Sequence, residues 1–399
     1  MAQATVVQQA STPSTGSFQT DRVLTLTGGH LIHDMFTSFV APLLPLIIQK
    51  LSLSLTLAGS LVAFQQLPSL INPFMGLLAD RISLRWFAIL APAITATAMS
   101  LIGVAPSYTV LVILLLVAGL STAAWHVPAP VMVRRVSGQQ VGQGMSFLML
   151  GGELAYTIGP LLAVAAVSWW GLEGTWRLIP LGIAASVILY WRLHDADARP
   201  AENGNNNGSW AGSWRELRLV MLPLAGIIVA QGFMSAALAT YLPTFLSKEG
   251  ASLWLAGSAY STMQAAAAAG SLATGTLSDR LGRRRVLAFA LIAGPALMLL
   301  FLAARGWEIF PILAALGMTG LATTPVQLTL VQEYSRDHPA TANGIYMATS
   351  FAGRSLIIIA VGVMADHWGL RPTFQACALL SFAAAPFVLL LPKKTIAGR

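Results

Sequence analysis

The chain has 399 residues, of which 56% are hydrophobic and only 10% are charged, and its mean hydropathy is +0.70. A soluble protein of this length would carry about a quarter charged residues, so the composition excludes an ordinary water-soluble domain and indicates a protein that lies in lipid. The formal net charge of +8 is dispersed over many short loops. Because these cations form no single basic face, we exclude nucleic acid as a partner.

The chain opens with a polar segment. Residues 1–22 are rich in glutamine, serine and threonine, and they lack the basic start and apolar centre of a signal peptide. We therefore expect a disordered cytoplasmic tail. The single cysteine, Cys377, excludes an internal disulfide framework and argues against a cysteine-based metal site.

Apolar runs then follow one another to the end of the chain, each long enough to cross a hydrocarbon core of about 30 Å as a helix. Reading these runs between charges and glycine or proline breaks predicts twelve transmembrane helices. They lie near residues 24–48, 56–79, 86–105, 108–133, 141–168, 176–192, 218–246, 253–277, 286–304, 308–332, 341–365 and 373–391.

A polar linker divides the spans into two groups of six. Residues 194–214 are rich in glycine and asparagine and are too hydrophilic to be buried. We expect one six-helix bundle at residues 23–193 and a second at residues 215–399. The predicted fold is an all-α membrane protein with two pseudo-symmetric six-helix bundles.

Loop charges orient the molecule. With both termini in the cytoplasm, seventeen lysines and arginines lie on the cytoplasmic side and five on the opposite side. This bias matches the positive-inside rule. We expect an integral protein of the cytoplasmic (inner) membrane of a bacterium.

A loop motif occurs once in each half: GLLADRISLR at residues 76–85 and GTLSDRLGRR at residues 275–284. The pattern resembles the signature loop of the major facilitator superfamily, which implies a transporter whose halves rock about a central site. The resemblance implies that these loops form a cytoplasmic gate, with simple topogenic charge as the alternative. We place in this gate Gly76, Asp80, Arg81, Arg85, Arg134, Gly275, Asp279, Arg280, Arg283 and Arg284.

Three further stretches, GGHLIHDMF at residue 28, WHVPAP at residue 125 and GGELAYTIGP at residue 151, resemble the fosmidomycin-resistance-type branch of that family. The resemblance implies efflux of drugs or metabolites. Gly159 and Pro160 should bend the fifth span, because proline removes a helix hydrogen bond. The same pair resembles a proline motif associated with antiporters, which favours export over import.

Charged side chains lie deep within four spans. Asp34 is about 15 Å into the first span, with His30 one turn away on the same face. His126 is about 12 Å deep in the fourth span, Glu153 about 15 Å deep in the fifth, and Arg354 about 20 Å deep in the eleventh. Such groups are costly in lipid unless they are paired or hydrated. We therefore expect them to border one aqueous cavity.

We assign proton coupling to Asp34, Glu153 and His30, because a carboxyl group or imidazole takes up or releases a proton as its surroundings change. A purely structural Asp34 and a salt bridge between Glu153 and Arg354 are the alternatives. Arg354 suits an anionic substrate group, because its guanidinium donates two parallel hydrogen bonds. We assign further substrate contacts to His126, Gln65, Gln231, Tyr241, Tyr260, Gln264, Gln327 and Tyr346, although each could instead join helices.

The predicted function is secondary active transport by a monomer: proton-coupled antiport that exports small organic, anionic or drug-like molecules by alternating access. The alternative is a symporter that imports an anionic metabolite. An intramembrane lipid-modifying enzyme is a distant third, because the chain has no recognisable hydrolase, metalloprotease or nucleotide motif. We expect small-molecule substrates, protons and the lipid bilayer as partners, with no metal and no cofactor beyond the proton gradient.

Overall fold

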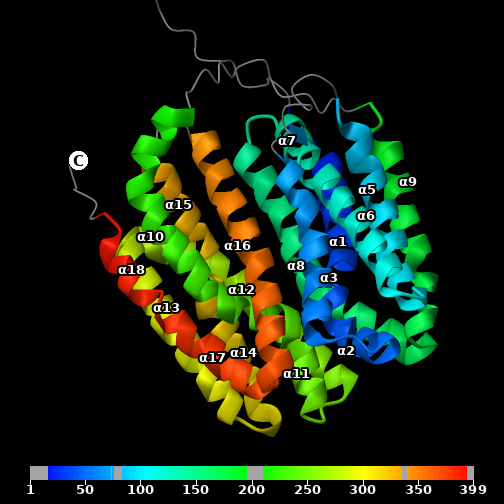
Figure 1. Cartoon of the computed structure of the whole chain (residues 1–399). Coiled ribbons are helices and arrows are strands. Elements are labelled where there is room, and N and C mark those ends of the chain that lie inside the picture. Colours follow the sequence, from blue (N-terminus) through cyan, green and yellow to red (C-terminus); the bar gives the residue numbers. More distant parts are fainter. Residues whose placement is uncertain (1–16, 73, 76–82, 196–209, 335–338, 393–399) are drawn as a thin grey trace, which may run out of the picture.

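The computed structural model (Figure 1) describes residues 17–72, 74–75, 83–195, 210–334 and 339–392. Regular structure in this part of the chain is helical throughout. The first half contains α1 (Thr20–Thr37), α2 (Val40–Leu51), α3 (Leu55–Gln66), η1 (Leu67–Ile71), α5 (Arg85–Ser100), η2 (Leu101–Val104), α6 (Tyr108–His126), α7 (Pro128–Val136), α8 (Val141–Trp170), η3 (Leu172–Leu178) and α9 (Ile179–Leu193).

The second half contains α10 (Trp210–Ala236), η4 (Ala237–Tyr241), α11 (Leu242–Lys248), α12 (Leu253–Leu281), α13 (Arg283–Ala303), η5 (Gly306–Glu308), α14 (Ile309–Leu316), η6 (Gly317–Leu321), α15 (Thr324–Tyr334), α16 (Pro339–Trp368), α17 (Leu370–Phe382) and α18 (Ala385–Leu390). In Figure 1 the first half, coloured from blue to green at α9, and the second half, coloured from green at α10 to red, stand side by side.

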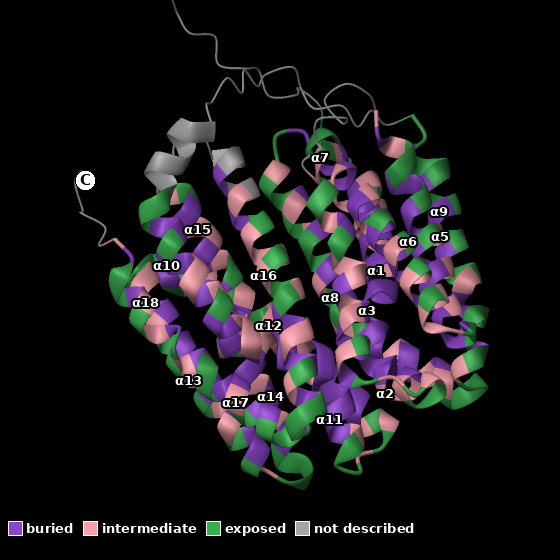
Figure 2. Ribbon diagram, viewed as in Figure 1, coloured by how far each residue is buried: buried purple, intermediate pink, exposed green. Residues whose placement is uncertain are grey.

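Ten helical segments of the described chain are long and apolar enough to cross a membrane. The second predicted span begins with the shorter apolar segment Leu55–Ile71, and the eighth is α12, a 29-residue helix. The twelve-helix arrangement in two bundles is therefore confirmed. Large apolar side chains such as Trp169 and Leu272 are 70% and 77% exposed, and Figure 2 shows such exposed positions along the outer faces of the bundles, where lipid would lie.

Several predicted spans are divided into shorter helices near prolines. The first span breaks between α1 and α2, because Pro42 has no N–H to bond the Ser38 carbonyl. The fourth breaks after His126, just before Pro128. The seventh contains the π-turn η4 just before Pro243. The fifth span differs: α8 continues through Gly159 and Pro160 as one helix of 30 residues.

Gly159 serves close packing. A Cβ atom there would lie 2.1 Å from Oγ of Ser38 and 2.4 Å from the carbonyl oxygen of Met35. A larger residue would therefore separate α8 from the break between α1 and α2.

The two halves are hydrogen-bonded at the end of the molecule that carries Lys50 and Lys248, which we call the far end. Asp366 of α16 accepts hydrogen bonds from the backbone N–H groups of Leu55 and Thr56 at 2.7 and 2.9 Å, and from the Thr56 hydroxyl at 2.6 Å. Tyr241 donates to the Leu55 carbonyl at 2.9 Å. Among the described residues, every side-chain hydrogen bond between the halves lies here.

The opposite end, which carries Arg85, Arg134 and Arg283, we call the basic end; the loop charges predict that it faces the cytoplasm. Gly76, Asp80 and Arg81 of the predicted gate lie outside the described residues. So do the linker residues 196–209 and most of the tail.

Candidate functional site

Asp34 lies at the centre of a buried group of histidines on α1 and α6. Its side chain is 5% exposed, and Oδ2 lies 3.1 Å from Nε2 of His30. Oδ1 lies 3.8 Å from Nε2 of His33 and 3.5 Å from Nε2 of His126. Three imidazoles therefore surround one carboxylate at ion-pairing distance. We call these four residues the histidine–aspartate cluster.

Glycines of α8 allow that helix to pack against the cluster. A Cβ atom on Gly152 would lie 2.7 Å from Cε1 of His30 and 3.4 Å from Oδ2 of Asp34. One on Gly151 would lie 2.5 Å from the carbonyl oxygen of Thr27. Small residues at such positions let helix backbones approach closely. The glycine pair thus places α8 directly beside the cluster.

A hydrogen bond fixes the protonated nitrogen of His30. Its Nδ1 atom lies 2.7 Å from the carbonyl oxygen of Leu148. A carbonyl oxygen only accepts, so Nδ1 carries the hydrogen and donates it. In the neutral ring, Nε2 then presents a lone pair toward the carboxylate of Asp34. Nε2 of His30 and Oδ1 of Asp34 are both buried without an aligned hydrogen-bond partner among the described residues.

A chain of hydroxyl groups fixes His33 in the same way. Ser121 donates to the carbonyl oxygen of Ala91 at 2.9 Å, and Thr95 donates to Ser121 at 2.8 Å. The Thr95 oxygen is therefore free to accept from Nδ1 of His33, 3.1 Å away. His33 is fully buried, and its Nε2 lone pair also faces the cluster.

His126 connects the cluster to the exterior. It is the last residue of α6, where the helix ends before Pro128, and its side chain is 38% exposed, against 6% for His30. Trp125 stacks on His33 with ring centroids 5.5 Å apart and covers the buried side. His126 is therefore the most exposed member of the cluster, while Trp125 covers His33.

Glu153 and Arg354 are placed differently from the cluster. Glu153 of α8 is half-buried and interacts electrostatically with Asp34 and His30. Arg354 of α16 is exposed and interacts electrostatically with Tyr156, which lies one turn beyond Glu153. No ion pair joins Glu153 to Arg354, both of which the structure describes. The alternative of a salt bridge between them is therefore not formed in this conformation.

Three predicted substrate contacts bind one another within the second half. Gln231 donates to the carbonyl oxygen of Gly320 at 2.7 Å, and its amide oxygen accepts from Gln327 at 3.2 Å. The hydroxyl of Tyr346 donates to Gln327 at 3.2 Å. All three side chains are buried. In this conformation they join α10, η6, α15 and α16.

The other neutral candidates lie at separate places. Gln65 donates to the carbonyl oxygen of Thr37 at 2.9 Å, beside the break between α1 and α2. Tyr241 is fully buried at the far end. Tyr260 donates to the carbonyl oxygen of Ala239 at 3.2 Å and interacts electrostatically with Arg354. Gln264 is half-buried on α12.

The described gate residues of the second half bind within that half. Arg283 pairs with Asp279 at 2.6 Å and with Glu333 of α15 at 3.2 Å. Arg284 donates to the carbonyl oxygens of Val388 and Leu389. The remaining described gate residues are Arg85, Arg134, Gly275 and Arg280, and none of them forms an ion pair with a described residue of the other half.

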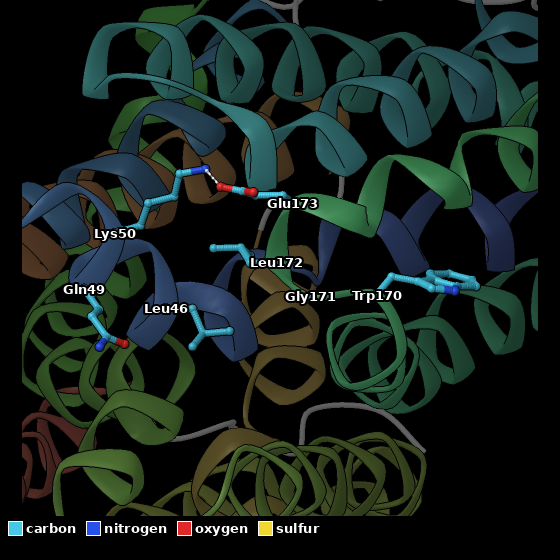
Figure 3. Close-up of a pocket in the computed structure, with 7 residues that line it drawn as sticks. All are labelled: Leu46, Gln49, Lys50, Trp170, Gly171, Leu172 and Glu173. Atoms are coloured by element: carbon cyan, nitrogen blue, oxygen red, sulfur yellow. Dashed lines mark hydrogen bonds and ion pairs between the residues drawn. The ribbon is translucent and has the colours of Figure 1, made fainter.

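Figure 3 shows a surface pocket of about 330 Å³ at the far end of the first half. Lys50 and Glu173 form an ion pair at 3.1 Å in its wall, and the other lining residues are Leu46, Gln49, Trp170, Gly171 and Leu172. Asp34 does not line this pocket. It is a depression between α2 and η3, separate from the histidine–aspartate cluster.

The sequence analysis assigned His30, Asp34 and His126 to a shared site, and the structure brings them together. It did not assign His33, Trp125 or Tyr156. Trp125 precedes a candidate histidine, and Tyr156 follows Glu153 by three residues. Searching the helix turns around each deep charged residue would have found both.

The sequence profile described as "Major Facilitator Superfamily" matches residues 26–358 and 224–398. The chain is 23% identical over 358 residues to the fosmidomycin resistance protein of Escherichia coli (strain K12), covering 88% of each. It is 26% identical over 344 residues to a probable 4-methylmuconolactone transporter of Cupriavidus pinatubonensis, covering 80% of this chain and 77% of that one.

Solved structures share the fold. An inward-facing bacterial homologue of the human lysosomal transporter Spinster superposes with a TM-score of 0.80 at 18% identity, covering 94% of this chain and 98% of that one. A D-xylose–proton symporter superposes with a TM-score of 0.70 at 16% identity, covering 95% and 99%.

Proposed function

The chain belongs to the Major Facilitator Superfamily, and from this membership we propose that it exports small organic anions in exchange for protons. As a member of this family it is a membrane transporter and not an enzyme. The proton gradient would supply the energy, with no other cofactor. Because both bundles lie in one chain, we propose that a monomer performs the cycle, with the basic end in the cytoplasm of a bacterium.

The observation that carries proton coupling is the position of Asp34. Its carboxylate is buried, yet it lies 3.5 Å from Nε2 of His126, whose side chain is 38% exposed. A proton from water would reach Nε2 of His126 first and then be shared with the carboxylate. Glu153, which interacts electrostatically with both Asp34 and His30, would be a second proton acceptor.

The exposed guanidinium of Arg354 supports an anionic substrate. A guanidinium binds carboxylate or phosphonate groups through two parallel hydrogen bonds. Tyr156 and Tyr260 both interact electrostatically with Arg354 and come from α8 and α12 in different halves. A substrate anion held there would contact both halves, so its binding could be coupled to their rocking.

Opening of the far end requires loss of the bonds that Asp366 and Tyr241 make to α3. In the proposed cycle, anion binding from the basic end favours that opening. Proton uptake at Asp34 after release of the anion would reset the cycle. The resistance activity named for the relative from Escherichia coli supports export.

Proton flux in proteoliposomes tests this proposal. Purified protein is reconstituted with a trapped pH-sensitive dye, and fosmidomycin is added outside as the probe. We expect anion-dependent proton flux with the wild type and loss of that flux with Asp34→Asn. Asp21→Asn is the matched control, because Asp21 lies on the same helix but is exposed. Undiminished flux in Asp34→Asn would overturn the assignment.

The name of the 4-methylmuconolactone transporter favours, as a second candidate, symport of an organic acid or lactone into the cell. The same proton-flux assay distinguishes antiport from symport. Anion entering by antiport carries protons out and makes the lumen alkaline, whereas symport makes it acidic. Arg354→Gln should raise the half-saturating concentration of an anionic probe and leave that of a neutral probe unchanged.

A further inference from the structure

The histidine–aspartate cluster also has the composition and spacing of a transition-metal site. We propose that it binds one divalent ion of the Zn²⁺ class through His30, Asp34 and His126. Imidazole nitrogen and carboxylate oxygen are ligands that Zn²⁺ and its neighbours in the first transition row accept. This inference stands on geometry alone and does not depend on proton coupling.

The distances suit a tetrahedral ion. Zn²⁺ binds nitrogen and oxygen ligands at about 2.0–2.1 Å, so two ligands at a tetrahedral angle lie roughly 3.3 Å apart. Oδ2 of Asp34 lies 3.1 Å from Nε2 of His30, and Oδ1, the other carboxylate oxygen, lies 3.5 Å from Nε2 of His126. One ligand atom from each of the three residues can be chosen within 4.8 Å of the others. Rotation of the His126 ring toward His30 would bring the three ligand atoms to the spacing that one ion requires.

The hydrogen-bond directions leave lone pairs pointing inward. Nδ1 of His30 donates to Leu148, so Nε2 is free to bind a cation. Metal-bound histidines usually donate their other ring nitrogen to a carbonyl or carboxylate, which fixes the ring. In the neutral state, Nε2 of His30 and the carboxylate are two acceptors at 3.1 Å. The lone pair of Nε2 and the carboxylate repel each other, and a cation bound between them would attract both.

The cluster has a buried side at His33 and an exposed side at His126. Nε2 of His33 lies 3.8 Å from Oδ1 of Asp34 on the buried side and has no aligned hydrogen-bond partner among the described residues. On the other side, the exposed edge of His126 leaves room for water or substrate. An ion bound here would join α1 to α6 and occupy the lone pairs to which protons bind.

Metal binding to the purified full-length chain tests the proposal. The protein carries no polyhistidine tag, and ZnCl₂ is titrated by calorimetry in detergent. We expect one Zn²⁺ per chain. His126→Ala should weaken binding by more than about 100-fold, since loss of even an outer-shell partner costs about 10–100-fold. His194→Ala and His367→Ala are matched controls, because these exposed histidines bond only their own helices.

A second variant keeps the proposal testable if His126→Ala misfolds. His126→Cys keeps a metal ligand, so it should bind Co²⁺ stoichiometrically and add thiolate-to-cobalt absorption to the ligand-field bands of the wild type. Absence of Zn²⁺ and Co²⁺ binding to the wild type would overturn the proposal. Equal affinity in His126→Ala and the wild type would overturn it too. Proton flux measured with a chelator present tests the proposed function independently.

Discussion

The hydroxyl of Tyr241 in η4 lies 2.9 Å from the carbonyl oxygen of Leu55 at the start of α3, so a side chain of the second half is bonded to the backbone of the first. The same hydroxyl lies 3.3 Å from the carbonyl oxygen of Ile358. Glycines make this position possible. A Cβ atom on Gly59 would lie 1.9 Å from the Tyr241 oxygen, and one on Gly362 would lie 2.7 Å from it.

Gly59→Ala should therefore loosen the far end. The added methyl group displaces the Tyr241 hydroxyl, and overpacking of this kind costs about 1–3 kcal/mol. We expect faster amide hydrogen exchange at residues 53–60, measured by mass spectrometry. Gly28→Ala is the control, since a Cβ there meets nothing within 4 Å. Equal exchange in both variants would show that the Tyr241 contact does not hold the halves together.

Asp366→Ala should weaken the same junction through the helix cap. Asp366 accepts hydrogen bonds from the first backbone N–H groups of α3, and loss of such a cap costs about 0.5–2 kcal/mol. We expect lower thermal stability and a shift toward conformations open at the far end, measured by labelling of an accessible residue placed there. Asp195→Ala is the comparison, because its ion pair to Arg22 lies within the first half. Equal effects of both variants would contradict a specific role for Asp366.

Gln231→Leu decides between a substrate contact and a structural one. The change removes the hydrogen bonds of Gln231 to the buried carbonyl of Gly320 and to the side chains of Thr323 and Gln327, which costs about 1–3 kcal/mol. We expect a lower unfolding temperature. Gln264→Leu should leave stability nearly unchanged, because the structure shows no hydrogen bond from Gln264 to a described residue. A weaker substrate affinity at unchanged stability would instead assign Gln231 to the substrate.

Glu249→Gln tests a pH-dependent ion pair at the far end. Arg371 hydrogen-bonds Glu249 at 2.8 Å and lowers the pKa of Glu249 below its ordinary value of 4.5. The folded state therefore binds this proton more weakly than the unfolded state. The resulting stabilisation is complete above about pH 4.5 and is lost as the pH falls through the lowered native pKa.

The expected effect of Glu249→Gln is small, because the two side chains are 46% and 43% exposed. Exposed pairs contribute about 0.2–1 kcal/mol. We expect the variant to unfold at a slightly lower temperature than the wild type at pH 7, and the difference in unfolding temperature to be smaller at pH 3. Glu308→Gln should be neutral at both, since Glu308 is exposed and forms no ion pair with a described residue. A larger difference in unfolding temperature between the wild type and Glu249→Gln at pH 3 than at pH 7 would contradict the lowered pKa of Glu249.

The spans could be predicted from the sequence because hydropathy alone determines which segments lie in lipid. The number and approximate positions of the spans are therefore confirmed. The breaks after Thr37 and His126 were missed. Each precedes a proline, but prolines also occur inside continuous helices here, as Pro160 does in α8. Packing against neighbouring helices decides whether a helix breaks near a proline or continues through it. This packing cannot be read from the local sequence.

Part of the site followed from helical spacing. His30 and Asp34 are four residues apart, and this spacing places them on one face of α1. The contact of His126 with Asp34 depends on how α6 packs against α1. The sequence predicted only how deep His126 lies in the membrane. Glu153 and Arg354 lie at corresponding levels of the two halves, yet α8 packs on α1 and α12 while α16 packs on α3 and α10. Similar depth in the membrane therefore did not imply contact.

Cys377, the only cysteine, is fully buried in α17. Thiol reagents would therefore leave the native chain largely unmodified. Paired spin labels or fluorophores could be introduced by single cysteine substitutions without first removing native thiols. The proposed rocking of the bundles could then be followed as distances between the probes in an otherwise natural sequence.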